Sequence, residues 1–372
     1  MVMDLQAYSL IVLVSAVCGL GAGYVMFRSD FCVTAMFRDY FLFGSALMLL
    51  NLLLLIVASM LLFELGRQFG WLDYYPFPLL GAPSLSNLIG GTVFGFGMVL
   101  AGGCVVGTLY KLGSGKVVSM AAFVGLVAGA TLYAELHPWW SQLSRTMQLS
   151  TSITLAQLLD IKPAYLLWPL LTMGAVYLYL QYRRGNLSRA SDAAGFLQPW
   201  KAALFISIIG FVSYLFVGMP MGITTSYSKF GAAIESLVLP THVASSSYFN
   251  AQPLNFIPPL SDSLIAGGAG PKLDGISAIQ YPLIIGIVLG SFIASVRVGE
   301  FKLSFSGRKE QYLIALVGGV IMGLGSRMTP GCNVWHLWGG IPILSLQSLL
   351  FLVGLLPGAW LGSAVLKRLL LR

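Results

Sequence analysis

Residues 89–107 read IGGTVFGFGMVLAGGCVVG, and they align without gaps with residues 317–335, VGGVIMGLGSRMTPGCNVW. The identical positions are mostly glycines: Gly90, Gly91, Gly95, Gly97, Gly103, Cys104 and Val106 match Gly318, Gly319, Gly323, Gly325, Gly331, Cys332 and Val334. A chance similarity between two apolar helices would align Leu with Val and would not hold glycines and a cysteine in register. We therefore interpret the two stretches as copies of one duplicated segment.

A weaker similarity pairs residues 31–39, FCVTAMFRD, with residues 222–230, GITTSYSKF. It aligns Thr34 with Thr225 and places Cys32 opposite an isoleucine. In both copies the segment is polar and follows an apolar stretch, so we expect a helix break at each place.

The chain around these repeats is strongly apolar. Its 372 residues are 57% hydrophobic and 9% charged, whereas an ordinary soluble domain has roughly 25% charged residues. A water-soluble fold is therefore excluded, and four cysteines in 372 residues are too few for a disulfide framework. The composition predicts a polytopic membrane protein.

A helix needs about 20 apolar residues to cross the hydrocarbon core, and the sequence predicts nine such spans plus short re-entrant half-helices in an all-α fold. The first span lacks a basic region before it and a cleavage site after it, so we keep it as a membrane helix rather than a signal peptide. The spans are 8–27, 41–63, 86–101, 116–135, 163–181, 200–217, 279–297, 311–326 and 344–366.

Lysine and arginine predict the orientation, because cytoplasmic loops carry an excess of both. With the N-terminus outside and the C-terminus in the cytoplasm, only six of the 21 basic residues fall outside: Arg67, Arg145, Lys162, Lys229, Lys272 and Arg327. The net charge of +8 then reflects orientation and contact with the anionic lipid bilayer. Nucleic acid is not an expected partner, since no basic stripe is interleaved with stacking aromatics.

The spans divide into three domains. Residues 1–135 form a first repeat of four spans with re-entrant segments near 31–39 and 103–115, residues 136–199 hold the fifth span as a linker, and residues 200–372 form the second repeat. A single linking span inverts the second copy, and inverted repeats are typical of transporters with a central substrate site. The second repeat also carries a polar outer segment, 236–278, which serves either as a lid or specificity element or as a plain connector.

The cysteines lack the patterns of redox or metal sites. None lies in a C-x-x-C pair, and the nearest approach to a metal site, Cys332 with His336, supplies two ligands where structural zinc wants four. We expect no metal and no cofactor. We interpret Cys18 as a small buried residue, whereas Cys32, Cys104 and Cys332 each follow a break and are placed to meet along a central path.

Thiols are soft, weakly donating groups that suit a ligand with a soft sulfur or selenium atom, or a soft metal ion. Helix N-termini beside them favour an anion. Lys111, Lys229 and Arg327 are the cations expected to gather anions near the ends of the path, although each polar residue alone also suits capping or packing. The predicted substrate-binding residues are Cys32, Thr34, Gly103, Cys104, Thr225, Gly331, Cys332 and Asn333.

The sequence lacks two features that would indicate how transport is driven by energy. No carboxylate falls at the centre of a predicted span, where a proton relay of a pump would lie, and the chain has no P-loop. The sequence therefore favours facilitated passage over active pumping, and a transporter over an enzyme.

At these cysteines the chain resembles the YeeE/YedE sulfur-transport family. The resemblance rests on G-x-x-x-x-R-S-D-F-C-V-T-A-M-F-R-D at 23–39, G-F-G-M-V-L-A-G-G-C-V-V-G at 95–107 and G-L-G-S-R-M-T-P-G-C-N at 323–333. It implies a bacterial inner-membrane importer of thiosulfate, shaped as an hourglass of two pseudo-symmetric halves. It also implies that Cys32, Cys104 and Cys332 pass thiosulfate on by S–H···S hydrogen bonds without covalent capture, with Cys104 near the constriction.

The resemblance further implies a small cytoplasmic TusA-like sulfur carrier as a partner. Some relatives are assigned to selenium metabolism, so a selenium or polysulfide species is the alternative substrate. Two other classes stay open: a membrane thiol oxidoreductase, in which two of the three cysteines form a disulfide, and a scaffold that anchors a soluble sulfurtransferase.

Overall fold

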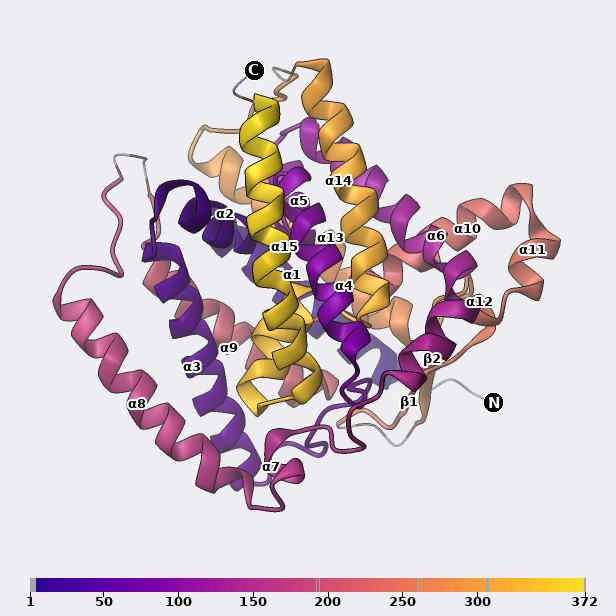
Figure 1. Ribbon diagram of the computed structural model, residues 1–372, viewed down its shortest axis with the longest axis horizontal. Coiled ribbons are helices and arrows are strands. Elements are labelled where there is room, and N and C mark those ends of the chain that lie inside the picture. Colours follow the sequence, from indigo (N-terminus) through magenta and orange to yellow (C-terminus); the bar gives the residue numbers. More distant parts are fainter. Residues whose placement is uncertain are drawn as a thin grey trace.

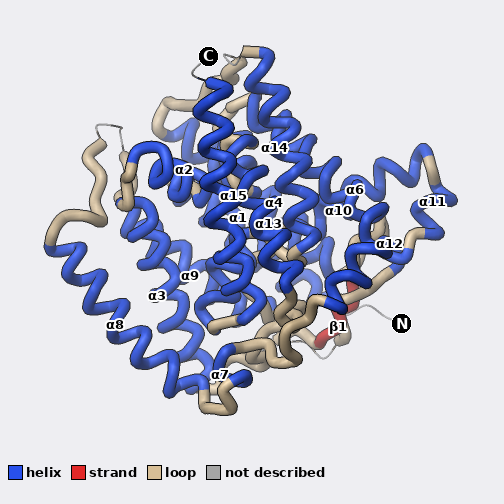
Figure 2. The backbone as a smooth tube through the Cα atoms, viewed as in Figure 1, coloured by secondary structure: helices blue, strands red, loops and turns tan. Residues whose placement is uncertain are grey.

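The computed structural model describes residues 5–370 apart from 192, 194, 260, 262, 306 and 307. Within these residues, nine helical stretches are long and apolar enough to span a membrane. The protein is built almost entirely of helices, with two short strands at one edge (Figure 1 and Figure 2). The predicted fold class, an all-α polytopic membrane protein, is confirmed.

The long helices are α1 (Leu5–Ser29), α3 (Leu47–Gln68), α4 (Leu85–Leu100), α6 (Val118–Thr146), α8 (Pro163–Arg183), α9 (Pro199–Val217), α13 (Gly275–Arg297), α14 (Lys309–Met328) and α15 (Leu346–Leu370). Four short helical segments follow long helices: α2 (Val33–Phe43) after α1, α5 (Val105–Gly113) after α4, α10 (Thr224–Val238) after α9, and the π-helical turn η1 (Val334–Gly340) after α14. The minor elements are α7 (Leu155–Leu158), α11 (Pro240–Ser245), α12 (Ser247–Asn250), η2 (Ile341–Ile343) and an antiparallel pair of strands, β1 (Leu254–Phe256) and β2 (Ile265–Gly267).

Two predicted spans have wrong boundaries. The second, 41–63, begins too early, because α2 continues to Phe43 and Gly44 ends it in the left-handed conformation (φ 68°) that glycine adopts without strain. The fourth, 116–135, is too short, because α6 continues to Thr146 past Pro138. The apolar pattern ends where polar side chains begin, but the helix α6 continues through these polar residues.

The long helices pack in corresponding pairs. The helices of the two halves correspond in chain order: α1, α2, α3, α4, α5 and α6 correspond to α9, α10, α13, α14, η1 and α15. Each main packing contact has a counterpart between the corresponding helices. Helix α1 packs on α13 as α9 packs on α3, α4 packs on α15 as α14 packs on α6, and α2 contacts α15 as α10 contacts α6. Helices α4 and α14 pack on each other in the middle of the molecule, whereas α8 lies at its edge (Figure 1).

Glycines allow these close contacts. A Cβ atom added to Gly91 would lie 2.5 Å from the carbonyl oxygen of Phe351 on α15, and one added to the matching Gly319 would lie 2.3 Å from that of Ala122 on α6. Between α4 and α14, a Cβ atom on Gly97 would lie 2.4 Å from the nitrogen of Met322. The repeated glycines Gly90, Gly91, Gly95 and Gly97 thus serve close helix packing, since any larger side chain would push the helices apart.

Candidate functional site

Three of the four cysteines lie where a short helix begins. Cys32 immediately precedes α2, Cys104 immediately precedes α5, and Cys332 precedes η1 by two residues. Each side chain is at most 1% exposed. The chain is broken before all three, because α1 ends at Ser29, α4 at Leu100 and α14 at Met328.

The thiols face the first N–H groups of these short helices. The Gly107 N–H donates to Cys104 Sγ at 3.3 Å, Cys32 Sγ lies near the Ala35 N–H, and Cys332 Sγ lies near the N–H groups of Val334 and Trp335. A helix start leaves its first N–H groups without partners in the helix. Cys104 therefore caps α5, and Cys32 and Cys332 place soft sulfur atoms at the starts of the other two helices.

Cys32 and Cys104 are brought together at Gly107. A Cβ atom added to Gly107 would lie 2.8 Å from Cys32 Sγ and 3.2 Å from Cys104 Sγ, and the two thiols contact each other. Glycine is required here because a methyl group would occupy the space where both sulfurs lie. Two of the three predicted thiols thus share one buried site.

The second half of the chain adds polar groups to this site. The Asn333 side chain lies beside the Cys104 thiol, and Tyr227 of α10 lies close to both Cys104 and Cys332. The sulfur atoms are therefore surrounded by residues from α2, α5 and α10 and from the turn before η1.

Several buried polar atoms around the thiols have no hydrogen-bond partner among the described residues. They are Thr34 Oγ1, Thr108 Oγ1, Tyr227 Oη, both amide atoms of Asn333, Trp335 Nε1 and Trp338 Nε1. Native proteins leave few buried polar groups unpaired, because each one costs free energy. Such a concentration of unpaired groups, most of them able to donate, suits a site that pairs them with a polar or anionic ligand.

A cavity of about 140 Å³ has Thr225, Arg327, Gly331 and Trp335 in its lining, and Gly331 is the residue before the buried Cys332. The Arg327 guanidinium donates to Thr225 Oγ1 at 3.1 Å and to Tyr248 Oη at 2.7 Å. These bonds fix a positive charge at the start of α10, where the helix dipole also favours an anion. Gly331 has a left-handed φ of 155°, and a Cβ atom there would lie 2.6 Å from Trp335.

Two further cavities lie around the end of α1 and the end of α5. One, of about 250 Å³, has Arg28, Lys116 and Arg189 in its lining. The other, of about 500 Å³, is lined in part by Lys111 and Lys302. Basic side chains outnumber acidic ones in both linings, although Glu300 lines both cavities and Asp30 lines the smaller one.

The structure separates the predicted polar residues into two groups. Thr34 and Asn333 lie buried with the thiols, whereas Thr225 lies in the cavity with Arg327. A Cβ atom added to Gly103 would lie 3.3 Å from the carbonyl carbon of Gly107, in the first turn of α5. The sequence analysis missed Tyr227 and Thr108. Each is the fourth residue of its short helix, one turn after the helix begins. This position is the signal that would have identified them.

His336 is not a ligand partner for Cys332. Its Nε2 lies 2.9 Å from the Thr329 carbonyl oxygen and its Nδ1 lies 3.0 Å from Ser348 Oγ, so both ring nitrogens are engaged. The cysteine and the histidine therefore do not form half of a metal site.

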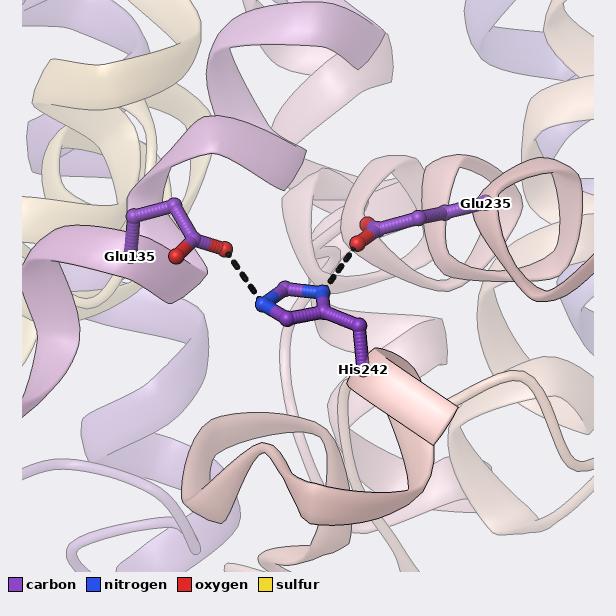
Figure 3. Close-up of side chains that lie close together, drawn as sticks. All are labelled: Glu135, Glu235 and His242. Carbon is purple, nitrogen blue, oxygen red and sulfur yellow. Dashed lines mark hydrogen bonds and ion pairs between the residues drawn. The ribbon is translucent and has the colours of Figure 1, made fainter. Parts of the chain in front are cut away.

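The outer segment 236–278 carries a histidine between two carboxylates. His242 Nδ1 contacts Glu235 at 2.5 Å and His242 Nε2 contacts Glu135 at 3.3 Å (Figure 3). The ligand atoms of the three residues lie within 4.8 Å of one another, as a metal site requires. The carboxylates meet opposite ring nitrogens, however, and this geometry matches a doubly protonated imidazolium that links α11 to α10 and α6. The hydrogen bond to Glu235 and the charge of Glu135 raise the pKa of His242 above 6.5.

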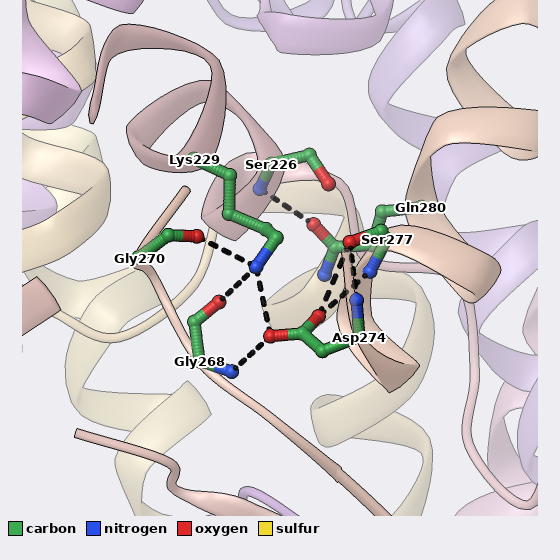
Figure 4. Close-up of polar contacts among 7 residues, drawn as sticks. All are labelled: Ser226, Lys229, Gly268, Gly270, Asp274, Ser277 and Gln280. Carbon is green, nitrogen blue, oxygen red and sulfur yellow. Dashed lines mark hydrogen bonds and ion pairs between the residues drawn. The ribbon is translucent and has the colours of Figure 1, made fainter. Parts of the chain in front are cut away.

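Lys229 is a structural cation, which corrects the prediction that it gathers anions. Its side chain is 0% exposed and lies 2.8 Å from Asp274 Oδ2. Its Nζ also donates to the carbonyl oxygens of Gly268 and Gly270 (Figure 4). Asp274 caps α13 by accepting from the Ser277 N–H at 3.1 Å. The lysine therefore fixes the outer segment to α10 and α13, and its charge is neutralised.

The sequence that forms this site matches a known protein family. Residues 28–361 match the family model described as sulphur transport. The chain belongs to the sulphur transport family.

Relatives agree with this family over almost the whole chain. A protein named thiosulfate transporter TsuA from Spirochaeta thermophila is 32% identical over 362 residues, which are 93% of this chain and 96% of that protein. The thiosulfate transporter TsuA of Escherichia coli is 31% identical over 366 residues, 95% of this chain and 94% of that protein. A probable transporter, YedE of Escherichia coli, is 27% identical over 45% of this chain. Membership confirms the predicted family and the predicted class, a transporter rather than an enzyme.

The buried lysine gives a prediction about stability. Lys229→Met leaves the Asp274 carboxylate without its cation, and removing one partner of a buried ion pair costs about 3 kcal/mol. We expect the melting temperature of the detergent-solubilised protein to fall clearly, as measured by intrinsic fluorescence. Lys272→Met, a matched change at an exposed lysine of the same segment, should leave it unchanged. Equal melting of the two variants would show that the Lys229 pair is not an anchor.

The histidine bridge gives a prediction about pH. Because the folded pKa of His242 is raised, its stabilising effect is complete below the unfolded value of about 6.5 and is lost as the pH rises through the folded pKa. We expect the difference in melting temperature between wild type and His242→Gln to be largest near pH 5.5 and to vanish at high pH. A difference that does not change with pH would contradict the imidazolium bridge.

Proposed function

We propose that the protein imports thiosulfate or a closely related reduced-sulfur anion along a path lined by Cys32, Cys104 and Cys332. The single observation that carries this proposal is the convergence of buried thiols and unpaired donors from several helix starts. Neutral, soft and donor-rich surroundings of this kind fit an anion that presents both oxygen and sulfur. The names of the two relatives that match over almost their whole length support the same substrate.

The two ends of thiosulfate match the two parts of the site. Its oxygen atoms carry hard negative charge and suit the Arg327 guanidinium, the Thr225 hydroxyl and the start of α10 in the outer cavity. Its terminal sulfur is soft and suits the buried Cys332 thiol, which lies one residue beyond Gly331 of the cavity lining. The anion thus approaches with its sulfur toward the chain of thiols.

The anion then moves along the cysteines through weak, reversible contacts. A thiol is a weak donor and a weak acceptor, so an S–H···S hydrogen bond holds the anion without a covalent bond. A conducting path needs sites that bind well enough to admit the ligand and weakly enough to release it. Transfer from Cys332 to the adjoining pair of Cys104 and Cys32 meets both needs, with Asn333 and Tyr227 as donors beside them.

We further propose the topology that this direction of transport needs. Residues 1–135 and 200–372 are inverted repeats that form the two halves of an hourglass, joined by 136–199, and the exchange of helix contacts supports this division. The N-terminus lies outside and the C-terminus in the cytoplasm of a bacterial inner membrane. The basic cavities with Arg28 and Lys111 then open inward, where a TusA-like carrier receives the sulfur.

The central thiol is tested by uptake. In a bacterial strain that lacks its own sulfate and thiosulfate importers, wild type should support growth on thiosulfate and uptake of the labelled anion. Cys104→Ala should lower the uptake rate by about tenfold or more, because each 1.4 kcal/mol lost at the limiting barrier slows passage tenfold. Cys18→Ala, a change at a buried cysteine of α1, is the matched control and should transport normally.

Other outcomes separate the alternatives. If Cys104→Ala transports as well as wild type, the thiol path is wrong. If wild type does not transport thiosulfate despite normal membrane levels, competition by selenium and polysulfide anions identifies the alternative cargo. A disulfide between two of the three cysteines during turnover, detected by mass spectrometry after rapid alkylation, would favour the oxidoreductase.

The space between the thiols is tested at Gly107. Gly107→Ala places a methyl group 2.8 Å from Cys32 Sγ, which forces the sulfurs apart, and uptake should fall by about tenfold. Gly210→Ala on α9 meets nothing within 4 Å and should keep full uptake. Equal uptake by both variants would mean that the anion does not pass between Cys32 and Cys104.

A further inference from the structure

A tyrosine borders both the paired thiols and one of the two basic cavities. Tyr110 lies on α5, one turn after Gly107, and its side chain is 2% exposed. Its ring atom Cε1 lies 4.0 Å from the point where a Gly107 Cβ would be, and both sulfurs border the same point. The other face of the residue lines the cavity of about 250 Å³ that also contains Arg28 and Lys116. The same residue therefore borders both the thiols and this cavity.

One hydrogen bond holds the ring in this position. The Tyr110 hydroxyl donates to Asp30 Oδ1 at 3.1 Å. Asp30 is the first residue after α1, and it has a left-handed φ of 51°, which few residues other than glycine, asparagine and aspartate adopt readily. This turn delivers the chain into Phe31 and Cys32 at the start of α2. The carboxylate that holds the ring and the thiol behind it are therefore placed by the same turn.

The backbone at Tyr110 is fixed independently of the ring. Its carbonyl oxygen accepts from Ser291 Oγ of α13 and from the Ser114 N–H at 3.1 Å. These bonds hold α5 in place without using the Tyr110 side chain. Breaking the bond to Asp30 frees the ring without disturbing Cys104, which caps the same helix.

We propose that Tyr110 is the inner gate of the path and that its hydrogen bond to Asp30 keeps this gate closed between passages. The inference rests on the proposed function for its direction, because the cargo must leave the thiols toward Arg28, Lys116 and Arg189. An anion arriving at Cys104 and Cys32 repels the Asp30 carboxylate and offers the hydroxyl another acceptor. The cargo itself then opens the gate, and the gate closes when the site empties.

The gate is tested by the reactivity of the thiols from each side. In a Cys18→Ala, Cys332→Ala background, only Cys32 and Cys104 react. A small charged methanethiosulfonate that does not cross membranes is applied to inside-out and to right-side-out vesicles, and adducts are counted over time by intact mass. Tyr110→Phe keeps the ring and removes the bond. It should raise the labelling rate by about tenfold from the side of the Arg28 cavity, as the loss of one hydrogen bond to a charged group implies, and leave the rate from the other side unchanged.

A double-mutant cycle assigns the effect to this bond. Asp30→Gly removes the carboxylate and tolerates the left-handed φ. Since either change breaks the same bond, Tyr110→Phe, Asp30→Gly and the double variant should label at the same rate. A double variant that labels at the product of the two single effects would overturn the proposal.

The control is another buried tyrosine with a bonded hydroxyl. Tyr214 is 1% exposed and donates to the Tyr74 carbonyl oxygen, away from the thiols. Tyr214→Phe should label like the background. If it labels as fast as Tyr110→Phe, or if Tyr110→Phe labels like the background, Tyr110 is not a gate. Labelling uses no thiosulfate, so this result stands or falls separately from the identity of the cargo.

Discussion

A helix that begins inside a membrane protein has backbone N–H groups that water cannot reach, and the site depends on how this chain satisfies them. Cys104 accepts from the first turn of α5, and Cys32 and Cys332 face the first turns of α2 and η1. A serine or aspartate would cap these helices more strongly. A thiol caps weakly and leaves its sulfur available, so the same residues that allow the breaks also provide soft contacts along the interior.

The two copies of the repeat have different roles at this site. In the first copy the starts of both short helices carry a cysteine, and these two thiols meet at Gly107. In the second copy the position that matches Cys32 is Ile223, so only Cys332 remains. The second copy instead places Arg327 beside Thr225 at the start of α10 and secures this arrangement with Tyr248 from the outer segment. One half of the protein is suited to collecting a charged ligand and the other to passing it on. Tyr248 and Pro253 belong to the segment 236–278 and contact the arginine or line the cavity, which favours a lid or specificity element over a plain connector.

Much of the fold is predictable from the sequence because the membrane imposes long apolar helices and because the repeat reveals itself in glycines. The nine spans and the breaks before Cys104 and Cys332 follow from these two signals. The position of Lys229 does not, since a lysine next to a helix break reads as a surface cation, and only the fold brings Asp274 and the Gly268 and Gly270 carbonyls around it. The meeting of Cys32 with Cys104 and the bond between Asp30 and Tyr110 also depend on tertiary packing. No local sequence pattern predicts a contact between residues that lie 72 or 80 positions apart in the chain.

The central claim is that thiosulfate travels along the cysteines. A structure of the protein soaked with selenosulfate, in which selenium replaces the terminal sulfur, tests it most directly, because anomalous scattering locates that one atom. We predict a selenium peak in contact with Cys332 Sγ or between Cys332 and Cys104, with the oxygen atoms of the anion toward Arg327 and Thr225. A peak confined to a place away from all three cysteines, with the thiols unoccupied at saturating ligand, would contradict the account.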